Sequence, residues 1–213
     1  MAVGQPEICV SVEDGIPFSS EWICEFFESE VAEGRRFRAG ETVQIGWMVT
    51  MLKERADGML ELWEPDFASI PITWRRGATS TLRHMEIQRA ISDEFDFLPH
   101  FASLEHAAVV GKSFFDAWPD ITLARDVPEG ANTGWVFRAR GSDEVECSYK
   151  SLYEIALACP SIIPFMALPP GIRVVCSGTE VTVAFGEDRI TSRENEILRK
   201  IAESNICGFG RVT

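Results

Sequence analysis

The clearest pattern of apolar and polar positions in this chain runs from Glu41 to Met51. Apolar residues occupy every second position there, and polar or small residues mostly fill the gaps: Val43, Ile45, Trp47, Val49 and Met51. A period of two is typical of a strand that buries one face of a sheet, so the pattern predicts a single strand. Asp57-Gly58 is a strong hairpin signal, and Met59 to Trp63 is therefore expected to pair back antiparallel.

A helical period marks three other segments. The first is expected to begin at Ser19 or Ser20, as N-cap residues, and to end near Gly34. A second helix is expected to follow Thr79 or Ser80, and a capping-box pattern at Thr191 and Glu194 predicts a third. The apolar positions assigned to the buried sides are Ile23, Phe27 and Val31, then Leu82, Met85, Ala90 and Ile91, then Ile197, Leu198 and Ile201.

Shorter apolar runs between these segments predict further strands. In the first half they are Glu7 to Val12 and Pro71 to Trp74, with Arg75 to Gly77 as a turn; in the second half they are Ala107 to Val110, Ile121 to Val127, and the hairpin of Ile172 to Cys176 with Val181 to Phe185. Strands and helices alternate irregularly, with several hairpins. The sequence therefore predicts an α+β fold of antiparallel sheets with packed helices, in two sequential domains, 1–100 and 101–213.

The stretch from Asn132 to Pro164 combines several signals. A turn at Asn132 to Gly134 leads into a short strand, in which Trp135 and Phe137 are expected to face the core. An acidic turn follows, and then an amphipathic helix that Pro160 ends. Core positions predicted across the chain are Trp47, Trp135, Phe137 and Ile155.

The order Thr-Gly-Trp, then Gly-x-Asp-Glu, then a helix running into Pro-Ser-Ile-Ile-Pro resembles the C-terminal part of the Imm33-like domain, from about His106 to about Phe185. This resemblance implies a bacterial immunity protein, which neutralises a toxin delivered between competing cells. The family pattern usually reads Asp-Ser-Gly-Trp, whereas this chain has Asn132 and Thr133 before Gly134 and Trp135. One carboxylate of the pattern is therefore missing.

The charge composition limits the kinds of molecule that the protein is expected to bind. The 213 residues include 20 basic and 33 acidic ones, a formal net charge of −13, which argues against nucleic acid and for a basic protein partner. Residues 1–100 carry most of this excess, with 9 basic and 18 acidic residues. No apolar run is long enough for a membrane span, and Met1 to Pro17 lacks the pattern of a signal peptide, so the cytoplasm is the expected location. The six cysteines form no Cys-x-x-Cys pair and are expected to be reduced and buried.

The sequence lacks the common motifs of nucleotide-binding proteins, hydrolases and metalloproteases. It contains no Walker loop, dinucleotide-binding glycine pattern, nucleophile elbow or His-Glu-x-x-His. Its three histidines, His84, His100 and His106, lack the spacing of metal ligands, and no sequence supports pairing one of them with a catalytic cysteine. No enzyme activity, cofactor or metal is therefore expected.

Three hypotheses remain open at this point. The first is an immunity protein that occludes a cognate, basic toxin stoichiometrically, with a toxin of type VI secretion or a related contact-dependent route as the partner and a nuclease as the preferred class. The second is a small cytoplasmic enzyme with an unrecognised site, and the third is an adaptor or scaffold. The oligomeric state is left open.

Two groups of carboxylates are the candidate partner-binding residues. Glu21, Glu25 and Glu28 stack on one side of the first predicted helix with no basic residue among them. The second group occupies the acidic turn after the Trp135 strand and comprises Asp143, Glu144 and Glu146. Each group is read either as a solvated surface or as a surface that receives a cationic partner.

Overall fold

A computed structural model describes residues 4–15, 19–143 and 145–206 of the chain. The chain divides into two compact units, Met1–Glu86 and Ile87–Thr213, and the division falls within helix α2 (Thr79–Asp93). Both units combine helices with sheets, so the α+β prediction is confirmed. Independent folding of the expected domains, 1–100 and 101–213, stays a prediction.

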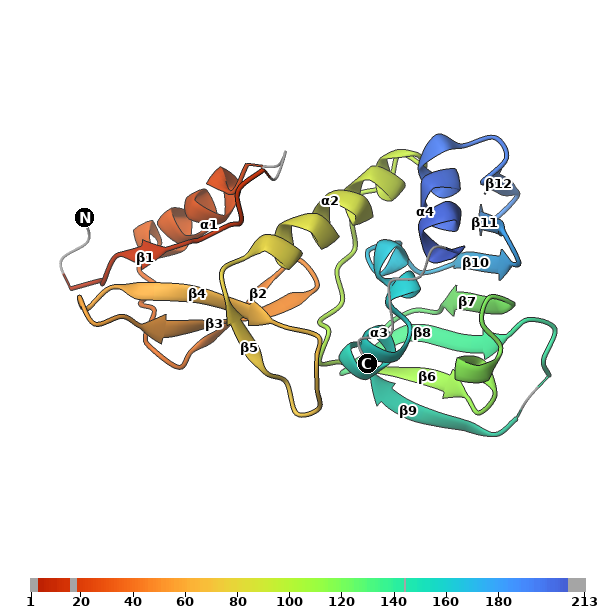
Figure 1. Ribbon diagram of the computed structural model, residues 1–213, viewed down its shortest axis with the longest axis horizontal. Helices are drawn as coiled ribbons and strands as arrows, with labels where there is room; N and C mark the ends of the chain where they lie inside the picture. The colour runs from red at the N-terminus through yellow and green to blue at the C-terminus, as the bar shows by residue number, and fades with distance from the viewer. Residues whose placement is uncertain (1–3, 16–18, 144, 207–213) are drawn as a thin grey trace. The chain divides into compact units, whose positions relative to one another are not determined.

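The first unit is built on a five-stranded sheet (Figure 1). Its strands are β1 (Ile8–Cys9), β2 (Thr42–Ile45), β3 (Met48–Glu54), β4 (Leu60–Pro65) and β5 (Trp74–Arg76). β4 pairs antiparallel with β3 and β5 and parallel with β1, and β3 pairs with β2. Helix α1 (Glu21–Ala32) packs Ile23 and Phe27 into the core that the sheet builds. The two helices and the β3–β4 hairpin agree with the predictions.

The single strand predicted from Glu41 to Met51 is wrong. The chain reverses at Gly46 and Trp47, and Ile45 pairs with Met48 across that turn. Gly46 has a φ of 61°, which favours glycine, and a Cβ there would lie 2.8 Å from the Met85 sulfur. Trp47 is fully buried although it lies in the turn. The apolar alternation therefore continues through the turn, and no polar residue marks the reversal.

Two shorter strands also differ from their predictions. β1 is only two residues long, and β5 contains Arg75 and Arg76, which were expected in a turn. Arg75 pairs with Glu64 of β4 at 2.8 Å, and Arg76 pairs with Glu61 of the same strand at 2.6 Å. These cross-strand ion pairs link residues that are distant in sequence, so no local pattern indicated them.

The second unit is built on a seven-stranded sheet in the order β12-β11-β10-β7-β8-β6-β9. The strands are β6 (Ala107–Gly111), β7 (Ile121–Arg125), β8 (Asn132–Ala139), β9 (Cys147–Ser151), β10 (Ile172–Ser177), β11 (Glu180–Phe185) and β12 (Asp188–Thr191). The helical elements are η1 (Phe114–Asp116), α3 (Leu152–Ala158), η2 (Pro160–Phe165) and α4 (Glu196–Ile206). All neighbouring strands are antiparallel except β6 and β8. The predicted hairpin of β10 with β11 is confirmed.

Three features of the second unit were not predicted or were predicted wrongly. β9 and β12, the two outer strands, were not predicted, because each is short and carries polar residues. The capping box at Thr191 and Glu194 does not cap the last helix. Asn195 does so instead, since its side-chain oxygen accepts the N–H of Leu198 at 2.9 Å.

Candidate partner-binding site

The Thr133-Gly134-Trp135 motif fixes the backbone at the start of β8. The hydroxyl of Thr133 donates to the carbonyl of Ala107 at 3.0 Å and accepts the N–H of Trp135 at 3.2 Å. The side-chain oxygen of Asn132 accepts the N–H of Gly134 at 3.0 Å, a local bond that an aspartate would also make. These contacts are internal to the fold, so the motif does not itself form a partner surface.

Gly134 is required by a close backbone approach. Its φ is 77°, and a Cβ at this position would lie 2.0 Å from the carbonyl oxygen of Asp126. The backbone N–H of Asp126 also donates to the carbonyl of Gly134 at 2.8 Å. A side chain at this position would push β7 and β8 apart.

Arg125 is a buried cation beside this motif, only 1% exposed. Its Nε donates to the carbonyl of Thr133 at 3.2 Å, and its Nη1 donates to the carbonyls of His100 and Leu168. Burial lowers the pKa of Arg125 to about 10, so the side chain stays charged at neutral pH. Arg125 therefore connects three separate backbone segments from inside the unit.

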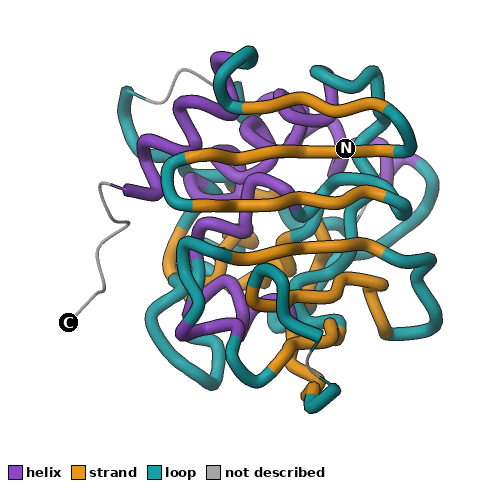
Figure 2. Tube along the Cα trace, turned by 90° about the vertical axis from the view of Figure 1, so that its right-hand side faces the viewer, coloured by secondary structure: helices purple, strands orange, loops and turns teal. Residues whose placement is uncertain are grey.

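The seven-stranded sheet has one covered face and one open face. A row of paired residues on the covered face is almost fully buried: Val183, Val174, Leu123, Phe137 and Val110. Ile155 of α3 and Leu198 of α4 are buried with this face. In Figure 2, strands lie in front and helices lie behind them. The side chains that alternate with the buried row consequently face outward.

A second row of paired residues crosses all seven strands on the open face. From β12 to β9 it consists of Arg189, Ala184, Arg173, Ala124, Val136, Val109 and Tyr149. Each of these residues keeps exposed surface, and Tyr149 is 72% exposed. The row is basic toward β12 and apolar toward β9.

The open face contains a hollow of about 440 Å³ over β7. Thr122 pairs with Arg138 of β8, and Ala124 pairs with Arg173 of β10, so two small residues lie between two long ones. This difference in side-chain length produces the hollow. Ser142, Asp143 and Asp126 also line it.

The arginines of this face form no ion pair with the described carboxylates. Within residues 4–15, 19–143 and 145–206, no carboxylate forms an ion pair with Arg138, Arg173 or Arg189. The Nε of Arg138 is buried and has no hydrogen-bond partner in the described part of the chain. By contrast, Arg140 pairs with Asp120 and Arg193 pairs with Glu180. The open face thus carries arginines without ion pairs among the described residues, and Asp126 and Asp143 line the same hollow.

The predicted carboxylates on α1 lie together at the surface. Glu21, Glu25 and Glu28 are all exposed. Partial burial and then the charges of Glu28, Glu21 and Glu25 raise the pKa of the Cys24 thiol between them. This shift is consistent with a negative potential on this side of the helix.

The carboxylates predicted on the acidic turn do not all lie at one site. Asp143 is exposed and lines the hollow on the open face, whereas Glu146 is exposed and pairs with Lys112 at 3.1 Å. Glu144 lies outside the described residues. The sequence reasoning did not select Arg138, Arg173 or Thr122, although the alternation in their strands placed them opposite the core.

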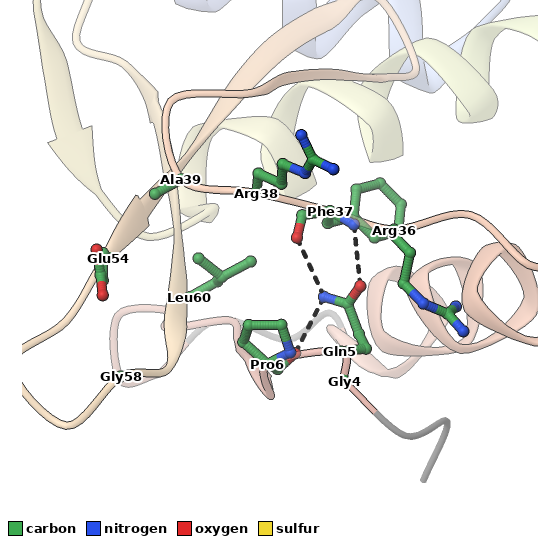
Figure 3. A pocket seen from close by; sticks show the side chains of 10 residues that line it. All are labelled: Gly4, Gln5, Pro6, Arg36, Phe37, Arg38, Ala39, Glu54, Gly58 and Leu60. Atoms are coloured by element: carbon green, nitrogen blue, oxygen red, sulfur yellow. Dashed lines mark hydrogen bonds between the residues drawn. The ribbon is translucent and has the colours of Figure 1, made fainter.

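The first unit also has a hollow, of about 450 Å³ (Figure 3). The side-chain amide of Gln5 closes one side of it, because Oε1 accepts the N–H of Phe37 at 2.9 Å and Nε2 donates to the carbonyl of the same residue at 3.4 Å. Arg36 and Arg38 lie on its wall. The Gln5 bonds attach the N-terminal segment to the segment after α1, so their role is structural.

The two buried cysteines are weak nucleophiles. Burial raises the pKa of Cys159 to about 11 and that of Cys176 to about 12, so both thiols are protonated at neutral pH. The expectation of buried cysteines fails at Cys24 and Cys147, which are exposed, and Cys207 lies outside the described residues. Where the structure describes the chain, no group of His, Cys, Asp and Glu is arranged to hold a metal ion. In the same ranges, none of the helices combines the length and apolarity that a bilayer crossing requires.

The comparisons with known proteins identify one segment. Residues 87–186 match the model of the Imm33-like domain. The match confirms the resemblance and begins earlier than the expected start at His106. It contains the Thr133-Gly134-Trp135 motif, β6 to β11 and the whole hollow on the open face. No curated protein and no solved structure matched the chain. The Imm33-like domain indicates a family of immunity proteins.

Proposed function

We propose that this chain is an immunity protein that binds and neutralises a cognate antibacterial toxin by stoichiometric occlusion. The observation that carries the proposal is the match of residues 87–186 to the Imm33-like domain. Occlusion requires a complementary surface and no catalytic group. The protonated buried thiols and the internal role of Thr133, Gly134 and Trp135 are consistent with such a mode of action.

The partner we propose is a basic toxin, delivered by type VI secretion or a related contact-dependent route and met in the cytoplasm. A net charge of −13 attracts a cationic protein over long distances and raises its association rate. The exposed carboxylates Glu21, Glu25 and Glu28 contribute to that attraction. A nuclease is our preferred class, because nucleases bind phosphates with basic clefts.

The test uses the product of the reading frame adjacent to this gene. We expect the two purified proteins to form a one-to-one complex in size-exclusion chromatography with light scattering. We also expect cells that express this chain to survive induction of the active toxin. Absence of both complex and protection would contradict the proposal.

A titration of toxin activity separates occlusion from enzymatic inactivation. Occlusion predicts that inhibition is complete at one equivalent and incomplete below it. Complete inhibition at a small fraction of one equivalent would instead favour the enzyme hypothesis.

A further inference from the structure

The open face of the seven-stranded sheet has the composition of a protein-binding surface. Tyr and Arg are enriched among the residues that contribute most to protein interfaces. Tyr149 lies at one end of the row across this face and Arg173 lies near the other, both of them exposed. Between them the face is formed by small and β-branched residues, namely Ala124, Val136 and Val109. A partner can therefore approach the strands closely.

The charge on this face indicates which chemistry it accepts. Arg138 and Arg173 stand on either side of the hollow. Asp126 and Asp143 also line it, but no described carboxylate forms an ion pair with either arginine. Arg173 is exposed and Arg138 keeps part of its surface exposed, so a bound group can accept hydrogen bonds from both guanidinium groups. A carboxylate is the acceptor whose planar shape matches a guanidinium group.

Apolar surface adjoins the hollow on the side of β9. Val136 pairs with Val109, and Val109 pairs with Tyr149, so an apolar strip leads from the hollow to the outer strand. Val145, which precedes β9, is 93% exposed. A partly exposed apolar strip beside arginines without ion pairs favours a segment with one acidic and one apolar part.

We propose that the open face of the Imm33-like domain is the surface that holds the toxin. The occupant is a segment of the toxin that places an Asp or Glu carboxylate between Arg138 and Arg173 and an apolar side chain on Val136, Val109 and Tyr149. This inference rests on the proposed function. It assigns anchoring to the basic sheet face, whereas the carboxylates of α1 contribute only long-range attraction.

The experiment measures binding kinetics of the adjacent gene product, purified and immobilised, against variants of the full chain. Arg173→Glu and Tyr149→Ala are the principal variants, because both residues are exposed and their substitution leaves the core intact. We expect each to raise the dissociation constant about tenfold or more, mainly through faster dissociation. Arg138→Glu should act similarly, and Arg138→Lys should recover part of the loss.

Matched controls come from the same unit. Arg199→Glu changes the net charge equally but lies on α4, and Leu98→Ala removes an apolar side chain that is 89% exposed outside the sheet. Both controls should bind within about twofold of the parent chain. Thermal unfolding of every variant identifies those that no longer fold. If Arg138→Glu does not fold, the binding of Arg173→Glu and Tyr149→Ala decides whether the sheet face anchors the toxin.

The outcomes separate the two proposals. If the parent chain binds and the Arg173 and Tyr149 variants bind equally well, the sheet-face inference is overturned and the immunity function stands. If the controls weaken binding as much as the principal variants, the face is likewise not the anchor. If the parent chain neither binds nor protects, the proposed function fails, and this inference fails with it.

Discussion

The guanidinium carbon of Arg125 lies 5.5 Å from the centroid of the Trp135 ring, and the two residues are directly paired across β7 and β8. Both are nearly or fully buried. A cation over the face of an indole ring is attracted by the ring's negative potential. The Trp of the family pattern therefore stabilises the buried arginine that binds three backbone carbonyls.

Replacing Trp135 with alanine should cost about 3 to 5 kcal/mol of unfolding free energy, because it leaves a cavity and removes the ring beneath Arg125. Urea unfolding followed by circular dichroism measures this loss. Tyr149→Ala is the control, since Tyr149 is an exposed aromatic residue on the same sheet. An unchanged midpoint for Trp135→Ala would show that this tryptophan is not part of the core.

Gly134→Ala should destabilise the protein by about 3 kcal/mol or more, because it combines a strained φ with overlap against the carbonyl oxygen of Asp126. Gly130→Ala is a matched control. Gly130 has a φ of 58° but nothing within 4 Å of the added Cβ, so only the conformational strain of about 1 kcal/mol is expected. Equal losses in thermal unfolding of the two variants would contradict the overlap argument.

His84 should make stability depend on pH. Its pKa is lowered to about 3, first by burial and then by the charges of Arg75 and Arg83. The residue keeps some exposed surface, but its Nδ1 is buried without a hydrogen-bond partner, which supports the direction of the shift. Below the unfolded pKa of about 6.5 the unfolded chain binds a proton that the folded chain does not. Stability contributed by neutral His84 is therefore lost as the pH falls from about 6.5 toward 3.

The measurement is the unfolding free energy of the parent chain and of His84→Gln at pH 7.5 and pH 5. The parent should lose more stability than the variant over this interval, by roughly 1 to 2 kcal/mol. His106→Gln is the control for replacing a histidine at an exposed position. A parent and a His84 variant with the same pH dependence would show that His84 is accessible to protons in the folded state.

Reversing Glu21, Glu25 and Glu28 to lysine should slow association with the toxin and flatten its dependence on salt. Exposed charges act at long range and are screened, so the dissociation rate should change little. Stopped-flow or surface-based kinetics at several salt concentrations would test this. A large increase in the dissociation rate would place α1 inside the interface instead.

Asp143→Ala tests the acidic turn. Asp143 lines the hollow between the arginines, so its removal should alter dissociation if the turn is buried in the complex. Loss of one partner of a desolvated charge pair costs about 2 to 5 kcal/mol, whereas loss of a solvated charge at the rim mainly affects association. Glu146→Ala serves for comparison, because Glu146 pairs with Lys112. Unchanged kinetics for Asp143→Ala would remove this carboxylate from the interface.

Local patterns in the sequence predicted most helices, several strands and the buried residues Trp47, Trp135, Phe137 and Ile155. They failed where the decisive contact is long-range. The Gly46-Trp47 turn keeps the strand alternation, and β9 forms only because β6 offers it an edge. Arg75 and Arg76 lie in β5, where ion pairs with Glu64 and Glu61 of β4 hold them.

The candidate site was less accessible to sequence reasoning than the fold. Because the net charge is −13, a count of charged residues favours carboxylates as the candidate binding residues. Such a count does not show which charges already form ion pairs with neighbouring residues. Arg138 and Arg173 are 35 positions apart in the sequence. They lie on opposite sides of β7 because β8 and β10 pair with its two edges. Their lack of ion pairs among the described residues becomes visible only in the structure.

The bond between Asn132 and Gly134 depends on an oxygen atom and not on a charge. The N–H of Gly134 needs only one oxygen lone pair from residue 132, and amide and carboxylate side chains both provide it. Asn in place of Asp at this position therefore preserves the turn and removes one negative charge. The charge beside β8 and the backbone of the motif are therefore independent of each other: Asn132→Asp would change the first and leave the second as it is.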